Sequence, residues 1–253
     1  MKKLVIAGMN VTYFETGDPE KTPLVLIHGW GQSYSFWEEI CRRYESTYHI
    51  YALDLPGFGM SEEPDRNWSI QDYSQFLAGF LSKENIIQPV IIGHSFGGRI
   101  AIHYCSNHSV KKLILYSTGG GLPEKSLLKN LNRLIFARFG ALLFPVFFYT
   151  FYSEHFKPKS YKNNMYVNVK RARRMLQIYC QPLFNLEKNL KKITAPTLVI
   201  VGENDNITDP ALGSEIAMRI PKARLVRIKK ATHFSHIEYP TETFAEMDKF
   251  LLR

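Results

Sequence analysis

The chain has 253 residues, of which 45% are hydrophobic and 22% are charged, and its formal net charge is +9. These values are ordinary for a soluble globular protein that forms one domain with an insertion. Three widely spaced cysteines, Cys41, Cys105 and Cys180, argue against a disulfide framework and against a zinc site. Neither a metal nor a cofactor is expected for the chemistry argued below. The apolar run that follows the first three residues is too short for a signal peptide, so the expected location is the cytoplasm.

Short apolar runs alternate with helix-like stretches along most of the chain. The predicted strands are 4–7, 11–15, 24–27, 49–53, 90–92, 112–116, 197–201 and 223–228, the first two forming a hairpin around residues 8–10. The predicted helices are 35–44, 70–81, 99–105, 210–220 and 241–252. This alternation predicts an α/β protein with a mostly parallel eight-stranded sheet that helices cover on both faces. Active sites of such sheets lie beyond the carboxyl ends of the strands.

The most informative motif is the pentapeptide Gly93-His94-Ser95-Phe96-Gly97, which lies between a predicted strand and a predicted helix. A Gly-x-Ser-x-Gly sequence at this place predicts a sharp strand-to-helix turn whose central residue has a strained backbone. Glycines are needed on both sides because the two backbones nearly collide there. The turn would hold the Ser95 hydroxyl beside the backbone N–H groups of a helix N-terminus, which predicts a nucleophile. The alternative is a glycine-rich turn with an incidental serine.

A nucleophilic serine needs a histidine base and a carboxylate that orients this base. His233 directly follows the last predicted strand and is interpreted as the base, whereas His236 is the competitor and is expected only to pack. Asp205 follows the strand at 197–201 and is the predicted acid, although an Asx turn would also explain it. Asp209 is interpreted instead as the N-cap of the helix that starts at residue 210.

The loop at 28–31 follows a predicted strand, and its glycines allow backbone N–H groups to face the serine. The N–H groups of Trp30 and Phe96 are the predicted oxyanion donors, and Gly29 is a predicted substrate contact. His28 is a further catalytic candidate but is expected to brace this loop by hydrogen bonds. The turn-rich loop at 54–61 is interpreted as structural.

Residues 119–192 interrupt the alternation and hold 14 lysines and arginines against three acidic residues, an excess of 11. Within them, the stretch 134–152 has one charge and eight aromatic side chains among its 19 residues. Gly140 and Pro145 break this stretch, so a hydrophobic helical lid over a pocket is favoured over a membrane span, with contact at a membrane surface as the alternative. The predicted substrate contacts of this lid are Phe136, Phe139, Phe144 and Phe148.

These motifs, in this order, resemble those of the α/β-hydrolase family, in the esterase-like branch with a serine nucleophile. The resemblance covers residues 1–118 and 193–253, which it identifies as the core, and it implies that residues 119–192 form an inserted α-helical cap. Ser95, Asp205 and His233 follow each other in the order expected for the family's triad.

Two positions bear on how closely the chain follows the family pattern. Thr232 stands where a glycine often precedes the histidine, which is a small departure. Some relatives carry the acid after the strand equivalent to 112–116, but this chain has Ser117-Thr118-Gly119 there, which favours Asp205 as the acid.

A serine at the centre of the strand-to-helix turn (the nucleophile elbow) fits acyl transfer, whereas dehalogenases and epoxide hydrolases of this fold use an aspartate there. The leading hypothesis is hydrolysis of carboxylic esters, with an apolar acyl group and an acyl-enzyme on Ser95. The alternatives are a carbon–carbon bond hydrolase of the ring-cleavage-product type, a hydrolase of carrier-linked acyl esters or thioesters, and a non-catalytic ligand receptor.

The basic insertion predicts an acidic carrier protein or an anionic substrate as partner, unless its charges only form a solvated helix face. Methyl esterases of this fold that act on pimeloyl-carrier substrates are similar in using basic cap residues. No nucleic-acid-binding motif is present in the sequence, so a nucleic-acid partner is not expected.

Overall fold

The computed structural model describes residues 1–119 and 187–252. Their core is an eight-stranded sheet with the strand order β1-β2-β4-β3-β5-β6-β7-β8. The hairpin of β1 and β2 joins β4 antiparallel, and every later pair is parallel. The strands are β1 (Lys2–Ile6), β2 (Met9–Thr16), β3 (Pro23–Ile27), β4 (His49–Leu53), β5 (Val90–His94), β6 (Lys112–Tyr116), β7 (Thr197–Gly202) and β8 (Ala223–Ile228). The predicted mostly parallel sheet of eight strands is therefore confirmed.

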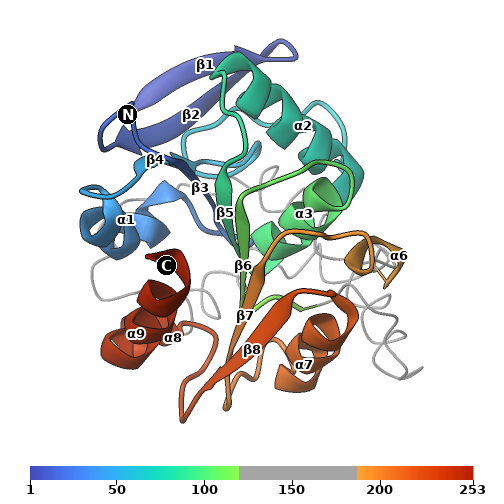
Figure 1. Ribbon diagram of the computed structural model, residues 1–253. Helices are drawn as coiled ribbons and strands as arrows, with labels where there is room; N and C mark the ends of the chain where they lie inside the picture. The colour runs from blue at the N-terminus through green and yellow to red at the C-terminus, as the bar shows by residue number, and fades with distance from the viewer. Residues whose placement is uncertain (120–186, 253) are drawn as a thin grey trace, which may run out of the picture.

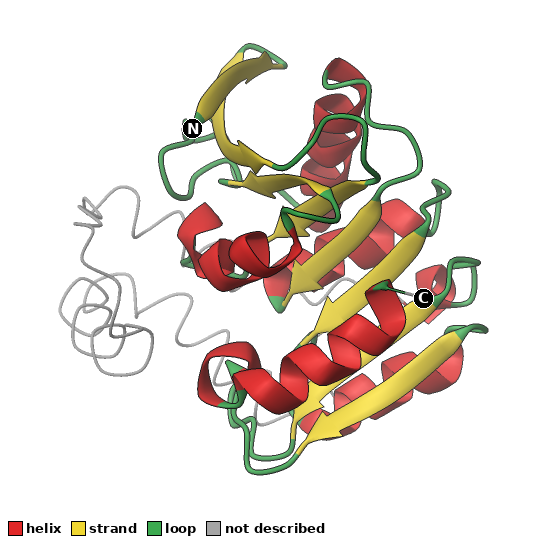
Figure 2. Ribbon diagram, turned by 60° about the vertical axis from the view of Figure 1, so that its left-hand side comes forward, coloured by secondary structure: helices red, strands yellow, loops and turns green. Residues whose placement is uncertain are grey.

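Helices cover both faces of this sheet (Figures 1 and 2). One face carries α2 (Ile70–Lys83), α3 (Phe96–Cys105), α6 (Glu187–Leu190) and α7 (Pro210–Arg219). The other face carries η1 (Tyr34–Trp37), α1 (Glu38–Tyr44), α8 (Ser235–Glu238) and α9 (Pro240–Leu251). The result is a three-layer arrangement with one apolar cluster on each side of the sheet.

The central strands are apolar throughout because both of their faces are covered. In β3, Val25 and Ile27 belong to the cluster under α2 and α3, whereas Leu24 and Leu26 belong to the cluster under α1 and α9. This division follows from the alternation of side chains along a strand. All four side chains are fully buried, and each such burial contributes about 1.5–3 kcal/mol.

The first hairpin differs from the prediction in the position of its turn. Ala7 and Gly8 form the turn, with φ of 49° and 81°, and Met9 and Asn10 already pair with β1. Positive φ at both residues is the pattern of a type I′ turn, whose twist matches that of the strands, and glycine adopts this conformation without a steric cost. The predicted turn at 8–10 was therefore placed too late in the chain.

Two predicted helices also differ from the structure at their starts. The predicted helix 35–44 is divided into η1 and α1, which meet at Glu38. Helix α3 begins at Phe96, three residues before the predicted start at Arg99, because the glycines after the serine are helical although they are typical of turns.

The predicted cap lies almost wholly outside the described residues, and so do Phe136, Phe139, Phe144, Phe148 and the stretch 134–152. Its last residues are described, and Leu190 is fully buried against the core. Asn189 Nδ2 donates to Ser106 Oγ at the end of α3, 2.7 Å away. Among the helices of residues 1–119 and 187–252, none is long and apolar enough to cross a membrane.

Candidate active site

Ser95 alone connects strand β5 to helix α3. Its φ of 51° and ψ of −110° lie in a region that residues with a side chain rarely adopt. The serine N–H donates to the carbonyl oxygen of Tyr116 in β6, 2.9 Å away, and this bond helps to hold the strained residue. A Cβ on Gly93 would lie 2.7 Å from the Gly97 oxygen, and a Cβ on Gly97 would overlap the carbonyl oxygen of Ile27. The sharp turn predicted from the pentapeptide is therefore present, and both glycines are needed for it.

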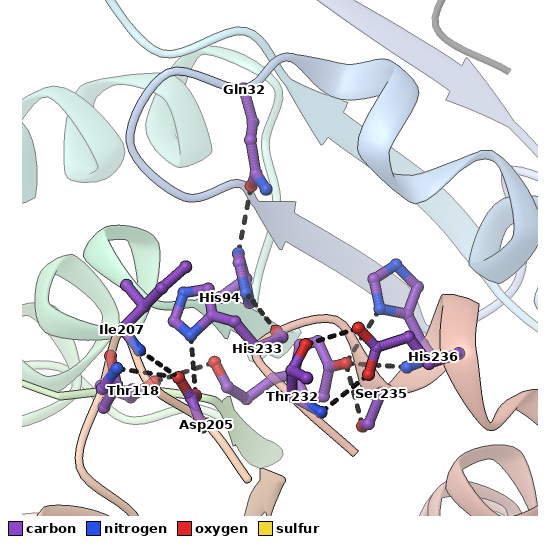
Figure 3. A network of polar contacts seen from close by, with 12 residues as sticks. Gln32, His94, Thr118, Asp205, Ile207, Thr232, His233, Ser235 and His236 are labelled. Carbon is purple, nitrogen blue, oxygen red and sulfur yellow. Dashed lines mark hydrogen bonds and ion pairs between the residues drawn. The ribbon is translucent and has the colours of Figure 1, made fainter. Parts of the chain in front are cut away.

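Asp205 and His233 lie in the loops that follow the neighbouring strands β7 and β8. The distance from His233 Nδ1 to Asp205 Oδ2 is 2.7 Å, and both side chains are buried (Figure 3). The other carboxylate oxygen of Asp205 accepts from the N–H groups of Ile207 and Thr208, at 2.9 and 2.8 Å. These backbone donors fix the carboxylate with Oδ2 turned to the imidazole. A carboxylate can only accept, so Nδ1 carries the proton and Nε2 is available as a base.

His236, the predicted competitor of His233, is part of a different network. Its Nδ1 and its backbone N contact the hydroxyl of Tyr116 at 3.0 and 2.7 Å, and its Nε2 lies 3.3 Å from the Phe36 oxygen. A carbonyl oxygen accepts, so Nε2 donates and Nδ1 accepts from the tyrosine. Burial lowers the pKa of His236 to about 4, so the ring is neutral at ordinary pH. This residue therefore braces α8 against β6 and η1, in agreement with the packing role expected for it.

Asp209 caps α7, as the sequence predicted. Its carboxylate accepts from the N–H of Ala211, 2.9 Å away, and Pro210 occupies the first position of the helix. Asp209 therefore serves as a helix cap, whereas Asp205 is the carboxylate that contacts His233.

The loop before His233 is held by a carboxylate that follows it. Glu238 accepts from the N–H of Thr232 at 2.7 Å and from the Thr232 hydroxyl. A Cβ on Gly202 would overlap the carbonyl oxygen of Thr232, so the acid loop and the histidine loop are in close contact. Threonine in place of the usual glycine therefore gains a hydrogen bond that a glycine lacks.

The loop after β3 is held by His28, which is fully buried. His28 Nδ1 donates to the carbonyl oxygen of Gly29 at 2.7 Å, and Nε2 accepts from the N–H of Leu55 at 3.0 Å. Burial lowers the pKa of His28 to about 4, and the neutral ring matches this pair of bonds. Because the peptide that joins Gly29 to Trp30 is planar and trans, a fixed carbonyl also fixes the direction of the Trp30 N–H.

The second predicted donor belongs to the first residue of α3. The N–H of Phe96 has no acceptor within the helix, because the first N–H groups of any helix have none. It also lies at the positive end of the helix dipole.

The loop at 54–61 is structural in its contacts, as predicted. Asp54 is fully buried, and its carboxylate accepts from the N–H groups of Tyr34 and Met60 at 2.7 and 2.8 Å. The hydroxyl of Ser61 donates to the Asp54 carbonyl oxygen at 2.6 Å. These bonds close the loop on itself and tie it to η1, and the N–H of Thr12 in β2 donates to Ser61 Oγ at 2.9 Å.

The sequence does not single out Gln32, His94 and Tyr116, which the structure places in the polar network around the site. Each becomes informative only when its buried partner is known, because nothing in a linear pattern marks a side chain as buried and polar. In the described part of the chain, no three side chains of His, Cys, Asp or Glu are grouped in a way that could hold a metal ion.

Comparisons with known proteins identify a family and several relatives of this chain. A family model described as "Alpha/beta hydrolase family" matches residues 24–247. The chain is 28% identical to Lipase 1 of Psychrobacter immobilis over 96% of its own length and 81% of the lipase, and 26% identical to Lipase 3 of Moraxella sp. over 99% and 84%. It is 23% identical to the pimeloyl-[acyl-carrier protein] methyl ester esterase of Aliivibrio salmonicida, over 94% and 95%. Among solved structures, a bacterial membrane phospholipase A matches with a TM-score of 0.80 and 26% identity, over 99% of this chain and 84% of that one.

Proposed function

The chain belongs to the alpha/beta hydrolase family, and we propose that it hydrolyses carboxylic esters through an acyl-enzyme on Ser95. The observation that carries this proposal is the strained backbone of Ser95, φ 51° and ψ −110°, at the N-terminus of α3. It lies at the carboxyl edge of the sheet that also carries the Asp205–His233 pair. The lipases and the esterase among the relatives support ester chemistry.

In the first half of the reaction, Ser95 Oγ attacks the acyl carbon while His233 Nε2 takes the hydroxyl proton. The resulting imidazolium donates through Nδ1 to Asp205 Oδ2, at 2.7 Å. The charge that develops on the carbonyl oxygen is stabilised by the N–H groups of Trp30 and Phe96, and loss of one such donor costs about 3 kcal/mol. The tetrahedral intermediate then collapses, the bond to the alcohol oxygen breaks, and His233 gives its proton to the leaving alcohol.

In the second half, a water molecule attacks the acyl-enzyme. His233 takes one proton from this water and returns it to Ser95 Oγ as the carboxylic acid leaves. The same donors stabilise both tetrahedral intermediates, so the reaction needs one histidine and one oxyanion site.

The proposed substrate has an apolar acyl group, because the segment 134–152 is rich in aromatic residues. The excess of 11 positive charges within residues 119–192 supports a substrate with a carboxylate or phosphate, or one presented by an acidic carrier protein. The relative that acts on a pimeloyl-[acyl-carrier protein] methyl ester gives this second part of the proposal its support.

A turnover assay over matched substrates tests the proposal. We expect hydrolysis of p-nitrophenyl esters to increase with acyl length, and Ser95→Ala to lower kcat by roughly 10⁴-fold or more with little change in Tm. An anionic ester should lose kcat/KM as salt is raised, whereas a neutral short ester should not, because screening acts on charged encounters.

Three outcomes would contradict the proposal or one part of it. Full activity of Ser95→Ala on the esters would remove the assigned nucleophile. Faster cleavage of a vinylogous dienoic diketone acid than of every ester would replace ester hydrolysis by hydrolysis of a carbon–carbon bond. Equal responses of both esters to salt would reduce the basic segment to a solvated face.

A further inference from the structure

A buried polar bridge connects the loop after β3 to the nucleophile elbow (Figure 3). Gln32 Oε1 lies 2.8 Å from the backbone N of Gly29 and 3.0 Å from His94 Nδ1. His94 is the last residue of β5 and directly precedes Ser95. Both bridge side chains are buried, with 7% of Gln32 and 1% of His94 exposed. The bridge therefore joins the two segments that carry the predicted oxyanion donors.

The protons of this bridge follow from its partners. The N–H of Gly29 can only donate, so the amide oxygen of Gln32 faces it, and the same oxygen accepts a second bond from His94. A neutral ring can donate to only one of the two oxygens that it faces, and Gln32 Oε1 at 3.0 Å is closer than the carbonyl oxygen of His233, so we assign the proton to Nδ1. Burial, together with the nearby His233, holds the pKa of His94 well below its usual range, so the ring is neutral. Its Nε2 lies 3.2 Å from the carbonyl oxygen of His233, a contact that becomes a hydrogen bond only when the ring carries both protons.

Gly29 is fixed from both sides by these contacts. Its N–H donates to Gln32 Oε1, and its carbonyl oxygen accepts from His28 Nδ1 at 2.7 Å. A Cβ at this position would lie 2.6 Å from His94 Nδ1, so the loop backbone packs directly on the histidine ring. The next amide is that of Trp30, and its direction depends on how Gly29 is held.

We propose that Gln32 and His94 act together as positioning residues. They hold the Gly29–Trp30 peptide in a fixed position relative to the turn at Ser95, so that the Trp30 N–H points at the oxyanion. The inference rests on the proposed function, and neither side chain is assigned a contact with the substrate. The bond between Gln32 and His94 is the feature that matters, rather than the bulk of either side chain.

Two substitutions of His94 separate the hydrogen bond from packing. Asparagine places an amide N–H near the position of Nδ1, so it keeps a donor for Gln32 but loses the ring, which packs on Phe36 with centroids 4.5 Å apart. Phenylalanine keeps a ring of similar size but has no donor. We expect His94→Asn to lower Tm while kcat stays within about threefold of the parent, and His94→Phe to keep more of the Tm while kcat falls about 10–100-fold at a similar KM.

Gln32→Met tests the other half of the bridge, because methionine has a similar length and only a weak acceptor. Its kcat should also fall about 10–100-fold, and the double variant with His94→Phe should be no worse than the poorer single one, since the two residues act as a unit. The affinity for a boronic acid that forms a tetrahedral adduct on serine should fall in parallel with kcat. Ser35→Ala removes a hydroxyl in the same part of the chain that contacts Ser33 Oγ at 2.9 Å, outside the bridge, so it is the matched control and should retain kcat.

A failure of this inference can be told apart from a failure of the proposed function. If Ser95→Ala keeps its activity, the proposed function is wrong, whatever the bridge variants do. If activity depends on Ser95 but folded Gln32→Met keeps its kcat, or if His94→Asn is a poorer enzyme than His94→Phe, the inference is overturned. Additive losses in the double variant would also overturn it, because independent residues do not form one bridge.

Discussion

At the scale of single residues, the site depends on which atoms carry protons. Asp205 has one oxygen fixed by two backbone donors and one facing His233, so the carboxylate can select a single tautomer of the imidazole. His28 and His236 are as deeply buried, but each faces backbone or tyrosine partners and is held neutral. Neither burial nor a carboxylate partner alone identifies the base, because buried His49 also contacts a carboxylate, that of Glu15 at 2.9 Å. His233 differs from His49 in that its carboxylate pair lies at the carboxyl edge of the sheet, where Ser95 also lies.

The carboxylate assignment predicts different effects for two neighbouring aspartates. Asp205→Asn should lower kcat by roughly 10⁴-fold, because an amide can donate to Nδ1 and so disfavours the Nδ1–H tautomer. Asp209→Asn should change kcat little, because asparagine also caps helices and the site is only a cap. Steady-state kinetics of the two variants on one ester provide the measurement. Similar losses in both variants would show that the acid has been misassigned.

The places of Ser95, Asp205 and His233 in the fold could be predicted from the sequence, because each follows a parallel strand and the sheet brings such loops to one edge. Their catalytic roles stay a proposal. It could not predict Gln32 and His94 as partners, because 62 residues separate them and both are common in ordinary loops. The aromatic contacts proposed for residues 136–148 lie outside the described residues and stay predictions. The cytoplasmic location also stays a prediction.

At the scale of elements, the connection between β5 and α3 determines the position of the nucleophile. The strand and the helix approach so closely that a Cβ on Gly97 would overlap the carbonyl oxygens of Ile27 and His28. Backbone atoms of a central strand cannot move without disturbing its neighbours. The elbow is therefore fixed by packing between elements, and the strained φ of Ser95 persists for the same reason.

This packing predicts unequal effects for two glycine-to-alanine substitutions. Gly97→Ala should lower the free energy of unfolding by about 3 kcal/mol or more and abolish ester turnover, because the added methyl group overlaps backbone. Gly79→Ala in α2 meets only the Ile6 side chain at 3.2 Å, and the gain of about 1 kcal/mol in helix propensity offsets this contact. Urea unfolding of both variants provides the comparison. Equal stability of the two would contradict the packing argument.

The sequence pattern predicted the observed bounds of some buried strands, but it predicted the first turn and the start of α3 less accurately. The buried strands 49–53 and 112–116 were predicted at their observed bounds, because apolar runs of this length between turn signals have few other interpretations. The start of α3 was placed three residues late because close packing of Gly97 on the end of β3 decides how this glycine is used. The first turn was placed one residue late because Ala7, which is not a typical turn residue, adopts positive φ there.

At the scale of the whole molecule, the buried histidines connect stability to pH. Burial holds the pKa values of His28 and His236 at about 4, below the value of about 6.5 in an unfolded chain. Between these values the unfolded chain binds protons that the folded chain does not. The free energy of unfolding should therefore fall as pH is lowered from about 6.5 to 4, by about 3 kcal/mol for each histidine.

His236→Asn provides a test of this linkage. The variant should be less stable at pH 7, but its free energy of unfolding should fall less steeply on acidification. The two slopes should differ by about 1.4 kcal/mol per pH unit, because unfolding of the variant takes up one proton fewer. Denaturant unfolding at a series of pH values from 7 to 4.5 gives both slopes. Identical slopes would mean that His236 titrates normally in the folded protein.

The central claim is that Ser95 is the nucleophile, and covalent labelling tests it most directly. After reaction with a fluorophosphonate, trypsin should release a peptide from Glu84 to Arg99 in which Ser95 is the one hydroxyl-bearing residue, so a mass increase on this peptide locates the adduct. We predict one adduct per chain, carried by this peptide in the parent protein and absent from Ser95→Ala. An adduct on another peptide, or equal labelling of the variant, would contradict the assignment.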